Sequence, residues 1–146
     1  MPRSRTARAR EIGLALKLWV LLLLVRGSLK VFRYRATRGW LDRLGTRTRP
    51  RLARRSPAPK RIARLLEVAS GLVPDGGHCL TRSMVLEGVL RRRGHPARIE
   101  FGVAHGDGDA LEAHAWVLSG DEPLLGGEGR ARFTALSPPG SASPPR

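Results

Sequence analysis

The sequence predicts an α+β fold in which one helix packs on a small antiparallel sheet. Residues 80–93 have the length of a helix and end at Gly94, a residue that commonly follows a helix C-terminus. Residues 97–103 then alternate between apolar and polar side chains, which is the period of a half-buried strand. After a loop rich in glycine and aspartate, residues 113–118 resume an apolar strand, and residues 123–126 predict a short final one.

The helix of residues 80–93 is predicted to lie at the centre of the molecule. Its apolar side chains spread round more than one face, as in a helix that is buried on several sides. We therefore expect it between the sheet and an outer helical layer. Residues 61–70 also predict a helix, because their apolar residues recur at helical spacing up to Gly71.

The N-terminal part of the chain is strongly basic. Residues 1–64 contain 19 Lys and Arg against two acidic residues, a net charge of +17, while residues 65–146 contain 8 against 10. Prolines and arginines make residues 45–60 a linker or exposed loop, and residues 137–146 form a tail of Pro, Gly and Ser. The charge therefore divides the protein into two parts.

Residues 12–25 form an apolar segment that is interrupted by Gly13 and Lys17. We expect a helix that packs against the α+β domain, because these 14 residues fall short of the about 20 that span a bilayer. A secretory signal is disfavoured, because no small-residue cleavage site follows the segment. The alternative is a helix on a membrane surface, since arginines on both flanks would suit anionic headgroups.

Residues 29–44 are predicted to continue as an amphipathic helix that combines apolar and aromatic residues with Lys and Arg. This composition invites a nucleic-acid interpretation. A solvated basic helix face is favoured instead, because no helix-turn-helix, zinc-ligand or RNA-recognition motif accompanies the charge.

Cys79 is the one cysteine of the chain and the first candidate catalytic residue. It follows Gly76 and Gly77 and precedes the helix of residues 80–93, which places it at or near a helix N-terminus. Unpaired N–H groups and the helix dipole favour the reactive thiolate there, and the same groups could stabilise an oxyanion. The alternative role is that of a small buried hydrophobe.

His114 is the candidate base. It lies 35 positions after Cys79 in the strand of residues 113–118, and a helix start and a strand can bring two such residues together. The pair needs a third group to orient the imidazole. Four histidines and one cysteine match no common metal-ligand spacing, so neither a metal nor another cofactor is expected.

Four short motifs follow one another between about residues 60 and 135. They are Cys79-Leu80-Thr81-Arg82-Ser83, Leu90-Arg91-Arg92-Arg93-Gly94-His95-Pro96-Ala97-Arg98, Phe101-Gly102-Val103 and Ala113-His114-Ala115-Trp116-Val117. Each is weak alone, but the ordered set is fairly specific. It resembles the transglutaminase-like cysteine proteases of lasso-peptide biosynthesis, which remove the leader from a precursor peptide before a separate cyclase closes the macrolactam ring.

The resemblance implies a papain-like, transglutaminase-like core in which Cys79 is the nucleophile and His114 is the general base and acid. We therefore divide the chain into three parts. Residues 1–59 form a basic helical region and linker, residues 60–136 form the protease domain, and residues 137–146 form a disordered tail.

The third member of the family's triad is an Asp that follows the histidine beyond a short turn. The corresponding spacing falls here on Gly126 or Gly127, so the triad is incomplete. Asp121 lies in the turn and Glu128 lies just past the next predicted strand. Either could orient His114, as could a backbone carbonyl or a water molecule.

The predicted function is that of a cytoplasmic cysteine peptidase that removes the leader from a lasso-peptide precursor. By the same resemblance we expect a separate leader-recognition protein as a partner and the cyclase as a further one, with the basic N-terminal half as a docking surface. Membrane contact by residues 12–25 stays open. The alternative is a catalytically degenerate scaffold, or a basic adaptor for peptide, nucleic acid or membrane, which the missing Asp favours.

Overall fold

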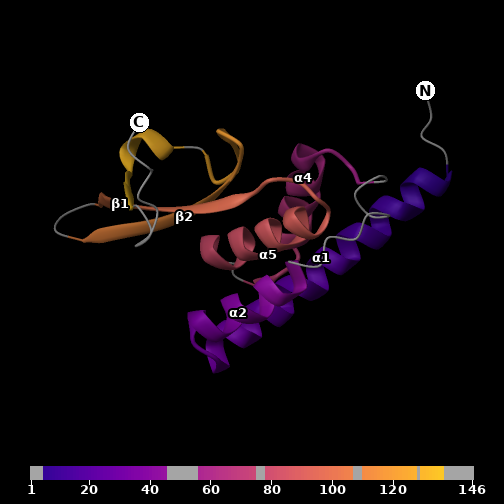
Figure 1. Ribbon diagram of the computed structural model, residues 1–146, viewed down its shortest axis with the longest axis horizontal. Helices are drawn as coiled ribbons and strands as arrows, with labels where there is room; N and C mark the ends of the chain where they lie inside the picture. The colour runs from indigo at the N-terminus through magenta and orange to yellow at the C-terminus, as the bar shows by residue number, and fades with distance from the viewer. Residues whose placement is uncertain (1–4, 46–55, 75–77, 107–109, 128, 137–146) are drawn as a thin grey trace.

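The computed structural model describes residues 5–45, 56–74, 78–106, 110–127 and 129–136 (Figure 1). Within these residues the elements are α1 (Arg5–Val31), α2 (Tyr34–Gly45), α4 (Pro59–Ser70), α5 (Cys79–Arg92), β1 (Arg98–His105), β2 (Leu111–Ser119), β3 (Glu122–Leu125), the 3₁₀-helix η2 (Arg130–Arg132) and β4 (Thr134–Leu136). The α+β prediction is confirmed. Most of the predicted linker and the whole predicted tail lie outside the described residues, and the division at residues 59 and 60 stays a prediction.

The strands form one antiparallel sheet in the order β3-β2-β1-β4. β1 and β2 pair over their whole length, with Gly102 opposite His114. β3 pairs with the end of β2, where Leu125 lies opposite Val117. Among the described residues, the part of β2 before Val117 therefore has no strand beside it on that side, and we name this side the open edge of β2.

Three of the strands lie where the sequence pattern predicts them, and β4 is an addition. Its three residues are all exposed. They are too few to show an alternating pattern, so periodicity cannot reveal them. β4 extends the sheet by pairing with β1 at Phe101, Gly102 and Val103.

The two faces of the sheet have different partners. Ile99, Val117 and Leu125 point toward the helices and join the main hydrophobic core. Because side chains alternate along a strand, His114 and Trp116 lie on the opposite face. We name the face toward the helices the helix face and the opposite one the far face of the sheet.

α5 lies between the sheet and the other helices, as the sequence predicts (Figure 1). It packs on β2 on one side and on α1, α2 and α4 on the others. Its apolar side chains are distributed round more than one face because several sides are buried. The fully buried ones are Met84, Val85, Leu86 and Leu90. The outer helices contribute Leu14, Leu18, Leu22, Val25, Leu41, Ile62 and Leu66 to the same core.

α1 is longer than the sequence pattern predicts. It continues past Val25 through Arg26 and Gly27. Packing explains the continuation, because Val25 is fully buried and Leu29, one turn later, packs against the same core. These contacts outweigh the about 1 kcal/mol that a glycine costs inside a helix. With 27 residues α1 is long enough to cross a bilayer, so the predicted length of 14 residues is wrong.

The prediction of one helix over residues 29–44 is also corrected. The chain leaves the helical conformation at Phe32 and Arg33, before α2 begins. Ser28 Oγ and Thr37 Oγ1 form a hydrogen bond of 2.9 Å, and Thr37 is fully buried. This hydrogen bond joins the two helices across the turn.

An ion-pair network fastens α2 to α5. The Arg38 guanidinium donates two hydrogen bonds to the Glu87 carboxylate, one of them 3.1 Å long. Asp42 accepts a further hydrogen bond of 3.3 Å from Arg91. Burial would lower the pKa of Arg38, but the hydrogen bond and the charge of Glu87 outweigh burial, so this pKa is raised. Glu87 is buried, so Arg38 supplies the charge that compensates its carboxylate.

Candidate active site

Cys79 is the first residue of α5, which confirms its predicted place at a helix N-terminus. Its thiol is free and partly buried. His78 is the N-cap residue, and no side chain of the described residues forms a capping hydrogen bond with the helix. N–H groups at the start of a helix have no partner within the helix, and such groups bind anions. Gly76 and Gly77 lie outside the described residues.

The first turn of α5 holds Cys79 beside β2. Ser83 Oγ donates a buried hydrogen bond of 3.2 Å to the carbonyl oxygen of Ala115. Residues four positions apart share one side of a helix, with their Cβ atoms about 5–6 Å apart. Cys79 therefore lies on the same side of α5 as Ser83, near the open edge of β2.

His114 lies in β2 with its imidazole on the far face of the sheet. The ring stacks on Phe133 at a centroid distance of 5.4 Å and on Trp116 at 6.1 Å, with interplanar angles of 28° and 29°. Trp116 is fully buried, and its Nε1–H donates a hydrogen bond of 2.8 Å to Glu100. Stacking on two aromatic rings therefore fixes the plane of the imidazole.

Gly126 and Gly127 stand where the family's Asp is expected, and Gly126 is the one that lies beside His114. Its φ is +71°, and a Cβ atom there would lie 2.9 Å from His114 Nε2 and 3.2 Å from the Ala115 carbonyl oxygen. The imidazole is thus turned toward the open edge of β2 and packs on the Gly126 backbone. No carboxylate of the described residues accepts a hydrogen bond from His114.

The structure does not bring Asp121 to His114. Asp121 is fully exposed in the turn between β2 and β3, where its carboxylate lies 3.5 Å from the Arg98 guanidinium. His114 precedes the end of β2 by five residues, which is about 17 Å along a strand. Orientation of His114 by Asp121 therefore has no contact to support it. Glu128 lies outside the described residues.

Cys79 and His114 reach the open edge of β2 from opposite faces of the sheet. α5 brings the thiol from the helix face, whereas the imidazole comes from the far face and points toward Gly126. Among the described residues, no hydrogen bond joins the thiol to the imidazole. Catalytic hydrogen bonds are often long in a free enzyme and tighten when the substrate binds.

A family model described as the Transglutaminase-like superfamily matches residues 19–138, which are 120 of the 146 residues. The chain belongs to the transglutaminase-like superfamily. The match begins inside α1 and contains both Cys79 and His114. Cysteine proteases are common in this superfamily, so the chain has a scaffold of the cysteine-peptidase type. No curated protein and no solved structure matches the chain.

A hollow of about 440 Å³ borders Gly126 in this transglutaminase-like domain. Glu67 and Arg82 line it together with residues 123–127. Arg82 follows Cys79 by three positions in α5, and its Nε–H is buried without a hydrogen-bond partner in the described part of the chain. The hollow therefore places one acidic and one basic side chain next to the open edge of β2.

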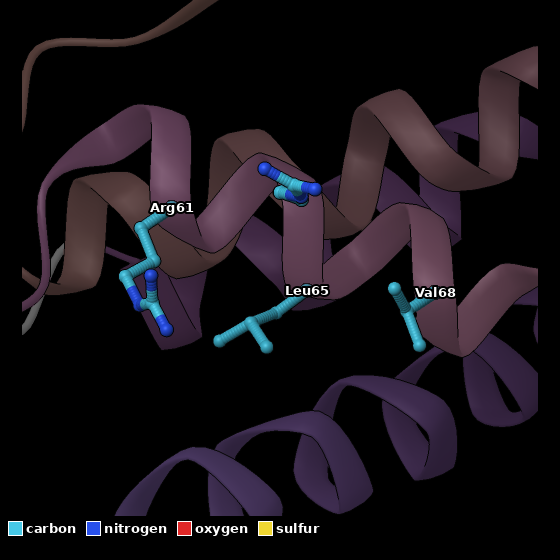
Figure 2. A pocket seen from close by; sticks show the side chains of 4 residues that line it. Arg61, Leu65 and Val68 are labelled. Carbon is cyan, nitrogen blue, oxygen red and sulfur yellow. The ribbon is translucent and has the colours of Figure 1, made fainter. Parts of the chain in front are cut away.

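A second hollow, of about 310 Å³, lies along α4 and has no candidate nucleophile or base. It is lined by Arg61, Arg64, Leu65 and Val68. Figure 2 shows Leu65 and Val68 projecting from the side of α4 that faces α1. We therefore assign the candidate site of the transglutaminase-like domain to the open edge of β2. Within the described residues, no cluster of three His, Cys, Asp or Glu could hold a metal ion.

Phe133 and Gly102 support His114, although sequence reasoning gave neither of them a role. A glycine inside a strand often marks the close approach of another group, and Trp116 lies over Gly102 in this way. Phe133 follows η2, and no local pattern shows that its ring reaches the imidazole. The glycine could have been found from the sequence, whereas Phe133 could not.

Gly102→Ala is expected to destabilise the domain by about 2 kcal/mol, the cost of overpacking a core. A Cβ atom at Gly102 would lie 2.4 Å from Trp116 Cη2, and Trp116 is fully buried, so it cannot move away freely. Urea unfolding measures the change as a lower midpoint. Gly39→Ala is the matched control, because nothing lies within 4 Å of a Cβ there, and alanine should stabilise helix α2 by up to about 1 kcal/mol. An unchanged midpoint for Gly102→Ala would contradict this packing of Trp116.

Proposed function

We propose that this chain is a cysteine peptidase that removes the leader from a lasso-peptide precursor. The observation that carries the proposal is the position of its two candidate catalytic residues. Cys79 begins helix α5, and His114 lies beside the same edge of β2. Membership of the transglutaminase-like superfamily supports the reaction class, and the four motifs around these residues support the substrate class.

In the proposed reaction, the Cys79 thiol gives its proton to His114, and the thiolate attacks the scissile carbonyl carbon. N–H groups at the start of α5 stabilise the resulting oxyanion. The imidazolium then protonates the leaving amine, and the C–N bond breaks to give an acyl-enzyme. Water that has lost its proton to His114 hydrolyses the thioester and releases the leader.

His114 can reach the thiol only if its imidazole turns from Gly126 toward the helix face. We place the substrate in the hollow of Glu67 and Arg82, because this hollow borders both Gly126 and the first turns of α5. Binding of the substrate in this hollow would then accompany the rotation that brings the His114 imidazole to the Cys79 thiol. This proposal assigns Arg82 and Glu67 to peptide binding.

The substrate is proposed to arrive in the cytoplasm on a separate leader-recognition protein, with the cyclase acting on the released core peptide. The net charge of +17 in residues 1–64 suits an acidic surface on such a partner. A partner that holds the leader raises the effective concentration of the scissile bond at the site.

Mass spectrometry of the cognate precursor, incubated with the chain, tests the proposal. We expect a leader fragment when the recognition protein is present, and cleavage at least about tenfold slower when it is absent. Intact precursor with the recognition protein present would overturn the peptidase function. Equal rates with and without this protein would overturn the partner assignment alone.

A catalytically degenerate scaffold that binds peptide without cleaving it is the second candidate. The contact of His114 with Gly126 favours it, because the described residues provide no acidic partner for the imidazole. In serine proteases, replacing the carboxylate of the triad lowers the rate by about four orders of magnitude. The same loss here would leave little peptidase activity.

Gly126→Asp is expected to cleave the precursor at least about tenfold faster than Gly126→Ala. Both variants add a Cβ at positive φ beside the His114 ring, so each strains the backbone and displaces the ring, although Asp tolerates this left-handed conformation better than Ala. Only the Asp variant adds a carboxylate that can stabilise the imidazolium. Initial rates of leader release give the comparison, and equal rates would contradict the role of His114 as the base.

A further inference from the structure

α1 lies on the outside of the molecule (Figure 1), and its outward side carries exposed apolar side chains. Leu14, Leu18, Leu22 and Val25 form its inward side and lie in the core. The opposite side, which we name the outer face of α1, consists of Ile12, Leu16, Val20, Leu23, Leu24 and Val31, each 38–75% exposed. α1 is therefore apolar on two opposite sides, and the domain covers only one of them.

The outer face of α1 is continuous. Leu16, Val20 and Leu24 recur at every fourth position, so they follow one another along one side of the helix. A hollow of about 380 Å³ lies along them and also contacts Lys17 and Leu21. Contiguous exposed apolar surface of this kind marks an interaction site.

The exposed charges beside the outer face are all positive. The exposed charged residues of α1 are Arg5, Arg8, Arg10, Lys17 and Lys30. The one acidic residue of α1 is Glu11, and it forms an ion pair with Arg61 of α4. Any occupant of the outer face must therefore be apolar at its centre and negatively charged around it.

The length and hydropathy of α1 suit a lipid environment. Within the described residues, α1 is one helix that is long and apolar enough to cross a membrane, over Arg8–Val31, and 22% of the apolar 18-residue window in this segment is buried in the protein. A core helix would be mostly buried. The superfamily match begins at residue 19, so removing α1 as a signal segment would delete part of the domain. Because the domain covers the inward side of α1, a position along a membrane surface fits this helix better than a span across it.

We infer that α1 docks on the surface of a membrane that contains anionic lipids, with its outer face in the boundary between headgroups and acyl chains. Residues 12–24 extend over about 18 Å of helix, and surface helices bury their apolar side to a depth of about 5–10 Å. The exposed cations at both ends of α1, and Lys17 between them, then face anionic headgroups. A second copy of the chain suits the outer face less well, because pairing two such faces would bring like charges together.

Co-sedimentation of the full chain with lipid vesicles tests this inference. Vesicles of phosphatidylcholine alone are compared with vesicles in which about a third of the lipid is phosphatidylglycerol. The unaltered chain should bind the anionic vesicles, and Leu16→Gln combined with Leu24→Gln should weaken binding at least about tenfold. Both leucines are exposed and glutamine is a good helix former, so the fold should persist. Leu111→Gln combined with Leu136→Gln makes the same change at two exposed leucines of the sheet and should leave binding unchanged.

Undiminished binding after the change at Leu16 and Leu24 would overturn the inference, since positive charge alone would then hold the chain on the vesicles. Failure of the unaltered chain to bind either vesicle would also overturn it. A dimer that dissociates in this variant, detected by analytical ultracentrifugation without vesicle binding, would assign the outer face to a second copy instead. The inference does not depend on the proposed peptidase, so Cys79→Ala should bind the vesicles like the unaltered chain.

Discussion

His114→Ala is expected to lower the rate of precursor cleavage about a thousandfold, which lies within the range that a general acid and base contributes. Without the imidazole, the site loses the group that we propose takes the thiol proton and returns it to the leaving amine. Quantitative mass spectrometry of leader release at saturating precursor measures the change. The effect should appear in kcat, because His114 acts on the reacting atoms.

His105→Ala is the matched control for this loss of a histidine. His105 ends β1 and is exposed, so its replacement should change the rate by less than about twofold. His114 also packs on Phe133, and a thermal melt of each variant separates loss of the base from loss of the fold. A folded His114→Ala variant that cleaves within about tenfold of the unaltered chain would contradict the assigned role.

Arg38→Ala is expected to lower the free energy of unfolding by about 3 kcal/mol, the cost of removing one partner from a buried ion pair. The Glu87 side chain is 7% exposed, so its carboxylate would lose its charged partner in a place that water scarcely reaches. Because the pair joins α2 to α5, the loss also loosens the layer that supports the Cys79 helix. Urea unfolding gives the change in the free energy of unfolding, when the dependence of that free energy on urea concentration is held the same for both proteins.

Arg35→Ala is the control for Arg38→Ala, because Arg35 lies on the same helix and is exposed. Its replacement should change stability by less than about 0.5 kcal/mol. Replacing Arg38 and Glu87 together by leucine should cost less than Arg38→Ala alone, because no unpaired charge would be left in the core. Equal stabilities of Arg38→Ala and Arg35→Ala would contradict the buried pair.

The central part of the fold could be predicted because its signals are local. The segment from Cys79 to Arg92 has helical length and a glycine after its end, and residues 98–105 carry the alternation of a strand. α1 was predicted too short, because only burial of Val25 and Leu29 carries the helix past Gly27. Such contacts between distant segments leave no periodic trace in the sequence.

The candidate site was predicted in its residues but not in its geometry. The sequence indicates Cys79 and His114, and the family resemblance implies the missing Asp, whereas the structure singles out Gly126 beside the imidazole. The turn that contains Asp121 is close to His114 in sequence but lies at the other end of β2. The thiol and the imidazole approach the open edge from opposite faces because of the strand register and the packing of α5. No single segment of the sequence encodes either of these features.

Mass spectrometry of the cognate precursor with the unaltered chain and with Cys79→Ala, each with the recognition protein, tests the proposed peptidase most directly. The removed atom is one sulfur at the start of α5, so binding of the precursor should persist while the nucleophile is lost. We expect a leader fragment with the unaltered chain and none with Cys79→Ala. The same fragment at the same rate with Cys79→Ala would contradict the role of Cys79 as the nucleophile and leave the superfamily scaffold without the chemistry proposed for it.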